Sequence, residues 1–348
     1  MKIFIYGSYR LKGEDVKLWQ YIVLRVLLII PTLFILLSIV FVLLRMIGDP
    51  IIAMVGMRAP PSVIAAMREQ AGLNKPLYQQ YVNYIFGILR GDFGTTMSVD
   101  HRPVISVIME RFPATLELTI AAFLVSVIIG LVTGTVAAWK RGLLDTTMRL
   151  YSIVSYALFI PWFGLMLQLV FGVYLKILPI GQRADPGLTP PYYTGLYVVD
   201  SIIAGRFDML MSALKHLILP AITLGVVLSG VYTRLLRNNM IDVMGQDFIL
   251  AYFARGIRDR KVLIHSLKNA FIPLVTMMGL QFAILLTGAI LTETTFSWPG
   301  LGTMIVERIQ YTDYTAVQGA VVFFAIFVAV TNVIIDIIYA FLDPRISY

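Results

Sequence analysis

Residues 118–139 read LTIAAFLVSVIIGLVTGTVAAW, a run of 22 residues without a charged side chain. A helix needs roughly 20 consecutive apolar residues to cross the hydrocarbon core of a bilayer, so this run predicts a transmembrane helix. The rest of the chain has the same character, because 58% of its 348 residues are hydrophobic and 14% are charged. In a typical soluble domain roughly 45–50% of the residues are apolar and about 25% are charged. The composition excludes a water-soluble enzyme, a disordered chain and a coiled coil, and predicts lipid as the main solvent.

Five further uncharged runs complete the prediction of an all-α membrane protein with six transmembrane helices. The six runs are Val26–Leu44, Leu118–Trp139, Leu150–Leu175, Leu217–Thr233, Asn269–Thr292 and Tyr314–Ile335. The third is the longest and is expected to form one span. The fourth is the shortest and contains Pro220. Gly130 and Gly134, four residues apart in the second run, permit a close contact with another helix.

The distribution of Lys and Arg predicts that both termini are cytoplasmic. Residues 1–17, 140–149, 237–268 and 342–348 carry 14 Lys and Arg in 66 residues. The segments on the other side, 48–112, 179–213 and 293–313, carry 9 in 121 residues. Cytoplasmic loops are enriched in positive charge, so the first set is assigned to the cytoplasm. The net charge of +8 is explained by this topology, and nucleic acid is not an expected partner.

Several kinds of chemistry are missing from the sequence. It contains no Cys, and its three His residues form no His-Glu-x-x-His pair. It has no Gly-x-Ser-x-Gly elbow and no Gly-Lys dipeptide, so a Walker A loop is excluded. We therefore expect no catalytic, cofactor-binding or metal-binding residues in this chain. If transport is driven by ATP, another subunit must bind the nucleotide.

Two carboxylates lie at the ends of predicted spans, Glu117 at the start of the second and Glu293 at the outer end of the fifth. Interfacial solvation or helix capping accounts for charges at such positions, and an ion or substrate path is the alternative. No carboxylate relay occurs near the middle of the predicted spans. This argues against a proton-coupled secondary transporter and against an intramembrane enzyme.

The outer segments are expected to contain helices and turns. Pro76 opens a helix in which Leu77, Tyr81 and Tyr84 share one face, either as a lid on the spans or as a partner site. Trp298-Pro-Gly-Leu-Gly302 predicts a type II turn with a positive φ at Gly300, followed by a short helix toward Gln310. That helix is expected to face the pathway or a receptor, and a plain surface loop is the alternative.

The predicted cytoplasmic loop 238–268 reads as two helices joined by a turn. A short helix runs from Gly245 to Gly256, where Asp247 can accept bonds from the first turn and Gly256 can adopt the left-handed conformation that ends a helix. A second helix begins near Asp259. The apolar side of the short helix, with Phe248 and Phe253 among its residues, suits either an interfacial amphipathic helix or a docking site for another protein. The residues alone leave both open.

The residues of this loop carry a resemblance. Gln246–Val275 is similar to the cytoplasmic loop of ABC-importer permeases of the dipeptide/oligopeptide/nickel branch. Further stretches that fit the family, in order, are Leu44–Pro50, Gly72–Leu77, Leu89–Gly94, Arg111–Leu118, His216–Ala221, Glu293–Gly302 and Phe341–Tyr348. Each motif is weak alone, but together they cover nearly the whole chain at the spacing of six spans.

The resemblance implies a type I ABC-importer permease fold in the cell membrane, surrounded by lipid, with a cytoplasmic coupling helix. Its implied partners are a second homologous permease, two ATPase subunits that bind ATP and Mg²⁺, and an external solute-binding protein. The residues implied to dock the ATPase are Asp247, Phe248, Ala251, Tyr252, Phe253, Arg255 and Gly256. Tyr252 replaces a usual alanine, and Leu250 stands where the family has Glu or Arg. Residues expected to contact the substrate pathway or the receptor are Glu117, Glu293, Trp298 and Gly300.

The implied organisation runs along the chain in five parts. These are a cytoplasmic segment 1–17, a first span 18–47, an outer loop with helices 48–112, a five-span core 113–341 and a cytoplasmic tail 342–348. The implied function is a permease subunit, without ATPase activity of its own, that imports oligopeptides. Oligosaccharides or nickel are the alternative cargoes of the same machinery.

The topology can be tested with single cysteines, because the chain contains none. We expect a Cys at Ser98 or Thr194 to react with a membrane-impermeant reagent added outside intact cells. A Cys at Arg258 or Ser347 is expected to react only after the membrane is opened, since positive segments remain in the cytoplasm. Labelling of Arg258→Cys from outside sealed cells would contradict the predicted orientation.

Overall fold

The computed structural model describes residues 18–47, 51, 60–70, 72–97, 101–140 and 142–342. The predicted segment 1–17, most of residues 48–59 and the tail after Leu342 lie outside this part. Within it the regular secondary structure is helical, apart from one isolated bridge between Thr95 and Pro103, and turns and loops connect the helices. The predicted all-α class is confirmed.

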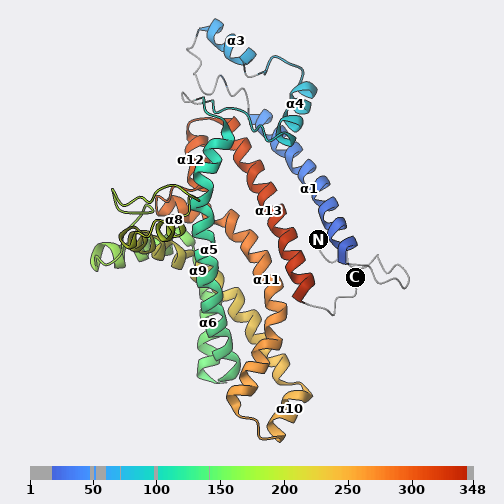
Figure 1. Cartoon of the computed structure of the whole chain (residues 1–348), viewed down its shortest axis with the longest axis vertical. Helices are drawn as coiled ribbons and strands as arrows, with labels where there is room; N and C mark the ends of the chain where they lie inside the picture. Colours follow the sequence, from blue (N-terminus) through green and yellow to red (C-terminus); the bar gives the residue numbers. More distant parts are fainter. Residues whose placement is uncertain are drawn as a thin grey trace.

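The helices follow one another from a long first element to a long last one (Figure 1). They are α1 (Leu18–Ile47), α3 (Pro61–Gln70), α4 (Leu77–Leu89), α5 (Val104–Trp139), α6 (Leu143–Ala157), α7 (Ile160–Leu167), the π-helix η1 (Gln168–Tyr174), α8 (Tyr197–Ile203), α9 (Phe207–Met244), α10 (Asp247–Ala254), α11 (Asp259–Thr295), α12 (Leu301–Gln310) and α13 (Tyr314–Leu342).

Three of these helices are individually long and apolar enough to cross a membrane, namely α5, α9 and Tyr314–Ile335 of α13. Two bent pairs pass the same test together: α6 with the segment Ile160–Tyr174, and the two parts of α11 on either side of its bend. The apolar stretch Leu27–Leu43 of α1 is shorter than these. The chain therefore has at least three apolar spans.

The third predicted span is wrong as a single straight helix. The chain turns by 105° between α6 and the segment that begins at Ile160. Leu158 and Phe159 are extended at this bend, with ψ of 129° and 112°. Pro161 lies in the first turn of α7, where it needs no N–H, whereas a continuous helix would place its ring against the carbonyl of Ala157. Hydropathy does not indicate this break, because the apolar run continues across it.

Close contact between α5 and α9 forms the centre of the fold. A Cβ at Gly130 would collide with Tyr232, and a Cβ at Gly134 would lie 2.9 Å from the carbonyl oxygen of Thr233. From the other side, a Cβ at Gly225 would collide with Val125 of α5. Small residues allow helix backbones to approach closely, so the contact predicted from Gly130 and Gly134 is confirmed.

Helix α4, from a segment predicted to lie outside, packs against α1 through its aromatic residues. The ring of Phe41 lies 5.3 Å from that of Tyr81 and 5.5 Å from that of Tyr84, and the Ser38 and Tyr81 hydroxyls are 2.6 Å apart. The lid interpretation is supported for these two tyrosines. Leu77, which was expected on the same face, is instead 64% exposed.

Figure 1 shows how the segments predicted to lie on opposite sides of the membrane are placed, with α8 about half-way along the molecule. Helices α3 and α4 lie at one end, and α10 lies at the tip of the other. Helices α1 and α13 pack side by side, and the start of α1 and the end of α13 are directed toward the α10 side.

Candidate functional site

Helix α10 is closed at its end by a glycine in the left-handed conformation, as predicted. Gly256 has a φ of +67°. Its N–H donates to the carbonyl of Phe253 at 3.0 Å, and the N–H of Ile257 donates to the carbonyl of Tyr252 at 3.1 Å. This pair of bonds is the Schellman motif, which satisfies the last carbonyls of a helix. The turn directs the chain into α11, whose first residue is Asp259, also as predicted.

The start of α10 differs from the prediction. Gln246 is the N-cap residue, and within the described chain it makes no side-chain capping bond. Asp247 is the first helical residue and is exposed. The expected cap by Asp247 is therefore absent, although a carboxylate in the first turn still suits the positive end of the helix dipole.

One side of α10 is packed on its own subunit. Ile249 is fully buried, and Phe248 packs against the cluster of buried side chains contributed by α9 and α11. The ring of Tyr252 lies 5.8 Å from Phe248 and 5.4 Å from His265 of α11. These contacts fix α10 against α11, so Phe248 and Tyr252 are more buried than the docking prediction assumed.

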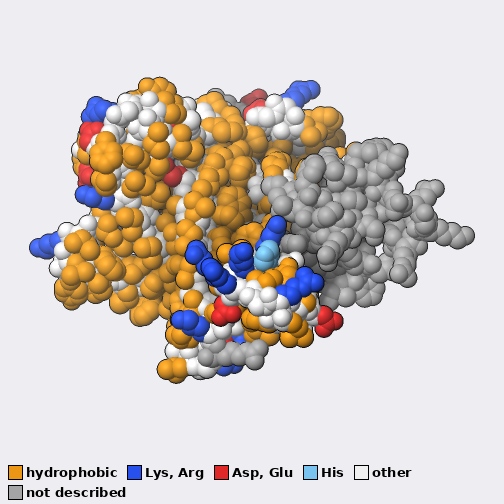
Figure 2. All heavy atoms as spheres, turned by 60° about the horizontal axis from the view of Figure 1, so that its bottom comes forward, with side chains coloured by type: hydrophobic (Ala, Val, Ile, Leu, Met, Phe, Trp, Pro, Cys, Tyr) orange, Lys and Arg blue, Asp and Glu red, His pale blue; other side chains and the backbone are white. Residues whose placement is uncertain are grey.

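The other side of α10 is apolar and open. Leu250 is 61% exposed and Phe253 is 49% exposed. Asp247, Ala251, Arg255 and Gly256 are exposed beside them. Figure 2 brings this end of the molecule forward and shows Lys and Arg side chains gathered among apolar ones. Leu250, noted from the sequence only as a departure from the family, is the most exposed large apolar residue of the helix.

Glu117, in α5, belongs to a buried ion pair within the chain. Arg183 donates to one oxygen of Glu117, and both side chains are less than one-tenth exposed. The second oxygen of Glu117 accepts the N–H of Val198 at 2.7 Å. Arg183 also donates to the carbonyl of Gly195 at 2.9 Å and lies 3.7 Å from the centre of the Tyr197 ring. Glu117 thus ties α5 to the loop that precedes α8.

Glu293 is also buried and bonded within the chain. Its carboxylate accepts the hydroxyl of Thr115 at 2.6 Å and the N–H of Thr303 at 3.1 Å. The Thr115 hydroxyl in turn accepts the N–H of Leu301 at 2.8 Å. Glu293 therefore joins α11 to the first turn of α12 and, through Thr115, to α5.

The expected type II turn at Gly300 is wrong. Gly300 has a φ of −95° and a ψ of −174°, which is an extended conformation open to any residue, and it serves as the N-cap of α12. The nearby residue with positive φ is Ser297, at 50°. Gly300 is required for a different reason, because a Cβ there would collide with the Glu293 carboxylate. The short helix to Gln310 is present as predicted.

Trp298 lies in the same region as Glu117, Glu293 and Gly300, and these four residues are called the outer cluster below. Its side chain is 1% exposed, and its indole N–H donates to the carbonyl of Ala114 at 2.8 Å. The structure thus brings Glu117, Glu293, Trp298 and Gly300 to one region where α5 meets the ends of α11 and α12. All four contact their own chain, and a role in the substrate pathway or at a receptor stays a prediction. Arg183, the partner of Glu117, was missed, although it is one of only two basic residues in 179–213.

The collision at Gly300 yields a stability prediction. Gly300→Ala should destabilise the protein by about 1–3 kcal/mol, because an added methyl group cannot be accommodated without displacing Glu293. Gly288→Ala is the matched control in α11, where nothing lies within 4 Å of the added Cβ and alanine favours the helix by about 1 kcal/mol. Thermal unfolding followed by tryptophan fluorescence compares the two, and equal midpoints would count against the assigned contact.

Comparison with known proteins places the chain in a family. Residues 126–348 match the model of binding-protein-dependent transport system inner membrane components, and residues 18–119 match the corresponding N-terminal model. The dipeptide transport system permease protein of Escherichia coli K12 is 38% identical over 337 residues, which cover 94% of this chain and 99% of the relative. The di/tripeptide permease of Pseudomonas aeruginosa is 38% identical over 333 residues, and the glutathione permease of Escherichia coli O1:K1 is 36% identical over 333 residues. Both of these alignments also cover 94% of this chain and 99% of the relative.

These matches extend over both the outer cluster and the α10 turn, and they agree with the apolar helices of the fold. The chain is a multi-pass protein of the cytoplasmic membrane, and it belongs to the family of inner-membrane components of binding-protein-dependent transport systems.

Proposed function

We propose that this chain is the permease subunit of an ATP-driven importer and that its cargo is short peptides. The observation that carries this proposal is the 38% identity, over 94% of the chain, to a protein named as a dipeptide permease. Relatives named for di/tripeptides and for glutathione support peptide cargo over sugars or nickel. Cargo would be delivered by an external binding protein, and a second permease would complete the pathway.

A six-span topology with cytoplasmic termini is part of the proposal. It counts α5, α9 and α13 as single spans, the two bent pairs as one span each, and the apolar stretch of α1 as the sixth. The direction of α1 and α13 toward the α10 end supports it (Figure 1). The excess of Lys and Arg in the segments assigned to that end supports it as well.

We further propose that the open face of α10 docks an ATP-binding subunit. Leu250 and Phe253 are large apolar side chains exposed at the tip of the molecule, beyond the spans. Exposed apolar patches on folded proteins mark interaction sites, and a position beyond the spans favours a protein partner over a lipid surface. ATP and Mg²⁺ would bind to that partner, because this sequence has no Walker A loop.

The packing of α10 suggests how movement would pass to the spans. Its buried side packs on α9 and α11 through Ile249, Phe248 and Tyr252. Close by, Arg237 of α9 donates two hydrogen bonds to the carboxylate of Asp145 in α6. A displacement of α10 by the ATPase would therefore move three helices together, as in rigid-body switching between two states.

The docking surface can be tested at Leu250. We expect Leu250→Asp to weaken binding of the ATPase subunits by about 2 kcal/mol or more, roughly 30-fold, because a central apolar anchor is replaced by a charge. Leu143→Asp makes the same change at an 80% exposed leucine of α6, in a segment also assigned to the cytoplasm, and should have no effect. Co-purification of the ATPase and uptake of alanyl-alanine into vesicles give the answer. Normal uptake by Leu250→Asp would refute the docking surface.

The turn after α10 gives a second test of coupling. Gly256→Val should strain the left-handed turn by about 1–2 kcal/mol and reorient the helix, whereas Gly256→Asn should retain most uptake because Asn tolerates this conformation. Gly245→Val is the control before the helix, where φ is −83° and the nearest atom to the added Cβ is 3.6 Å away. If Gly256→Val and Gly245→Val transport alanyl-alanine equally well, the geometry of this turn does not matter for coupling.

A further inference from the structure

A polar cavity of about 360 Å³ lies at the outer end of the molecule, away from the Glu117 and Glu293 cluster. Its walls come from the end of α1, the turn before α4, one face of α4, the loop 92–94 and the start of α13. Its volume falls within the ~300–1,000 Å³ of small-molecule sites. None of the residues assigned to docking or to the outer cluster lines it.

Buried polar atoms without hydrogen-bond partners are concentrated around this cavity. Seven such side-chain atoms occur in the described part of the chain, and three of them belong to residues that line this cavity: Gln80 Oε1, the Tyr84 hydroxyl and Gln318 Nε2. The Gln318 side chain lies against the Tyr84 hydroxyl and lowers its pKa, so these two groups compensate each other in part, and Gln80 Oε1 is the acceptor that has no partner. Buried polar groups in native proteins are almost always paired, so this arrangement suits a bound polar molecule.

The groups around the cavity are held in place by the rest of the structure. The amide nitrogen of Gln80 donates to the carbonyls of Leu73 at 3.0 Å and Lys75 at 2.7 Å, which leaves its oxygen as an unused acceptor. Tyr84 is supported by the ring of Phe41. Burial raises the pKa of Tyr84 to about 12, a rise that the Gln318 side chain only partly opposes.

The chemistry of the walls matches both ends and the middle of a short peptide. Gln80 offers an acceptor for an amide N–H, and Gln318 offers a donor for an amide carbonyl. The exposed Lys75 suits a terminal carboxylate, and the exposed Asp92 suits a terminal ammonium. We propose that this cavity binds a short zwitterionic peptide at the outer face of the permease, which rests on the proposed function for the nature of the cargo.

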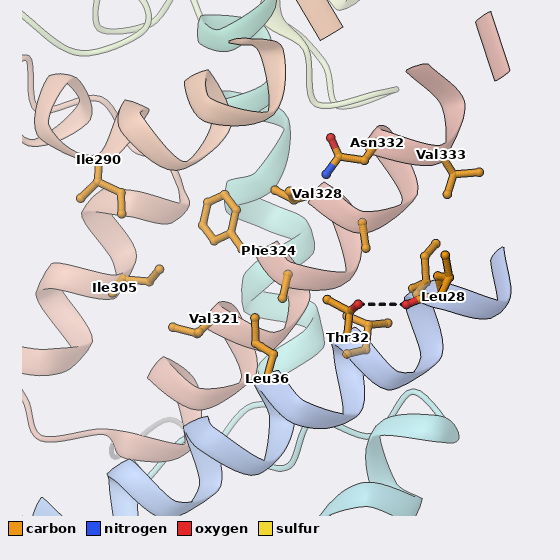
Figure 3. Close-up of a pocket in the computed structure, with 14 residues that line it drawn as sticks. Leu28, Thr32, Leu36, Ile290, Ile305, Val321, Phe324, Val328, Asn332 and Val333 are labelled. Carbon is orange, nitrogen blue, oxygen red and sulfur yellow. Dashed lines mark hydrogen bonds between the residues drawn. The ribbon is translucent and has the colours of Figure 1, made fainter. Parts of the chain in front are cut away.

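A lipid headgroup is the alternative occupant of this cavity. An apolar cavity of about 550 Å³ lies further along the same seam of α1 and α13, and Figure 3 shows Leu28, Thr32 and Leu36 facing Val321, Phe324 and Val328 across it. On α1 the two linings are nine residues apart, from Leu36 to Arg45, or about 13 Å along the helix, whereas on α13 Gly319 of the polar cavity and Val321 of the apolar one are two residues apart. Leu37 and Phe41, both buried, lie between them on α1. On the α1 side, a lipid with its headgroup in the polar cavity would have to pass these side chains to place its chain in the apolar one.

The test is protection of a cysteine in the complete importer without its binding protein, reconstituted in nanodiscs. Asn83 lines the cavity and is exposed, so Asn83→Cys should react with a maleimide. If alanyl-alanine binds with a dissociation constant of about 1 mM, about 10 mM peptide should slow labelling about tenfold. Val82→Cys, next to it on α4 and outside the cavity lining, should label at the same rate with and without peptide.

Loss of one wall group provides the specific control. In the Asn83→Cys background, Gln318→Leu removes the amide that the wall offers to the peptide and should abolish protection. Gln79→Leu makes the same change at an exposed position of α4 outside the cavity lining and should leave protection intact. Protection that depends on Gln318 would support the site.

The other outcomes would overturn it. Labelling unaffected by alanyl-alanine would show that the cavity holds only water, and labelling that responds to phosphatidylethanolamine content but not to peptide would assign it to lipid. Uptake of alanyl-alanine by the importer with its binding protein is measured in parallel. Normal uptake without protection from labelling refutes this site and leaves the proposed cargo intact. Absent uptake refutes the proposed cargo. The labelling result then decides separately whether the cavity binds the peptide.

Discussion

Backbone-to-backbone contact between α5 and α9 is the constraint on which the other helices depend. In a bilayer, helices gain little from the hydrophobic effect against one another, so close packing and hydrogen bonds between helices must hold them. Gly130 and Gly134 of α5 and Gly225 of α9 remove the side chains that would keep the two apart. The hydroxyls of Thr133 and Thr233, 2.7 Å apart, add a hydrogen bond at this contact. Helices α6 and α11 both pack on α9, and these contacts position them.

Two regions of the molecule use buried groups in different ways. In the outer cluster, charged side chains are buried and paired, and this is costly unless every bond is made. The bonds of Glu117 and Glu293 therefore define one arrangement of the loop before α8 and of α12. At the α10 end, apolar contacts hold one side of a short helix and leave the other side open. One region is thus held in shape by paired charges, and the α10 end presents an open apolar face.

Local backbone geometry was predicted well where a single residue carries the signal. Gly256 has the positive φ expected of a glycine that ends a helix. This could be predicted because the hydrogen bonds that end a helix join residues only a few positions apart. The reason for Gly300 was predicted wrongly, because its neighbour Glu293 reaches it across a turn that the sequence does not show. The partner of Glu117 was missed for the same reason, since Arg183 is 66 residues away along the chain.

The sequence by itself determined that the chain is helical, that much of it lies in lipid and where most helices are found, because hydropathy and helix-ending residues act over a few turns. Tertiary structure alone decided the 105° bend before Ile160, since an apolar run does not report its direction. It also decided which face of α10 is open. Phe248 and Leu250 are both apolar and lie two residues apart, but α9 and α11 cover the first and leave the second 61% exposed. Which of two similar side chains is available to a partner depends on neighbours that lie far away in the sequence.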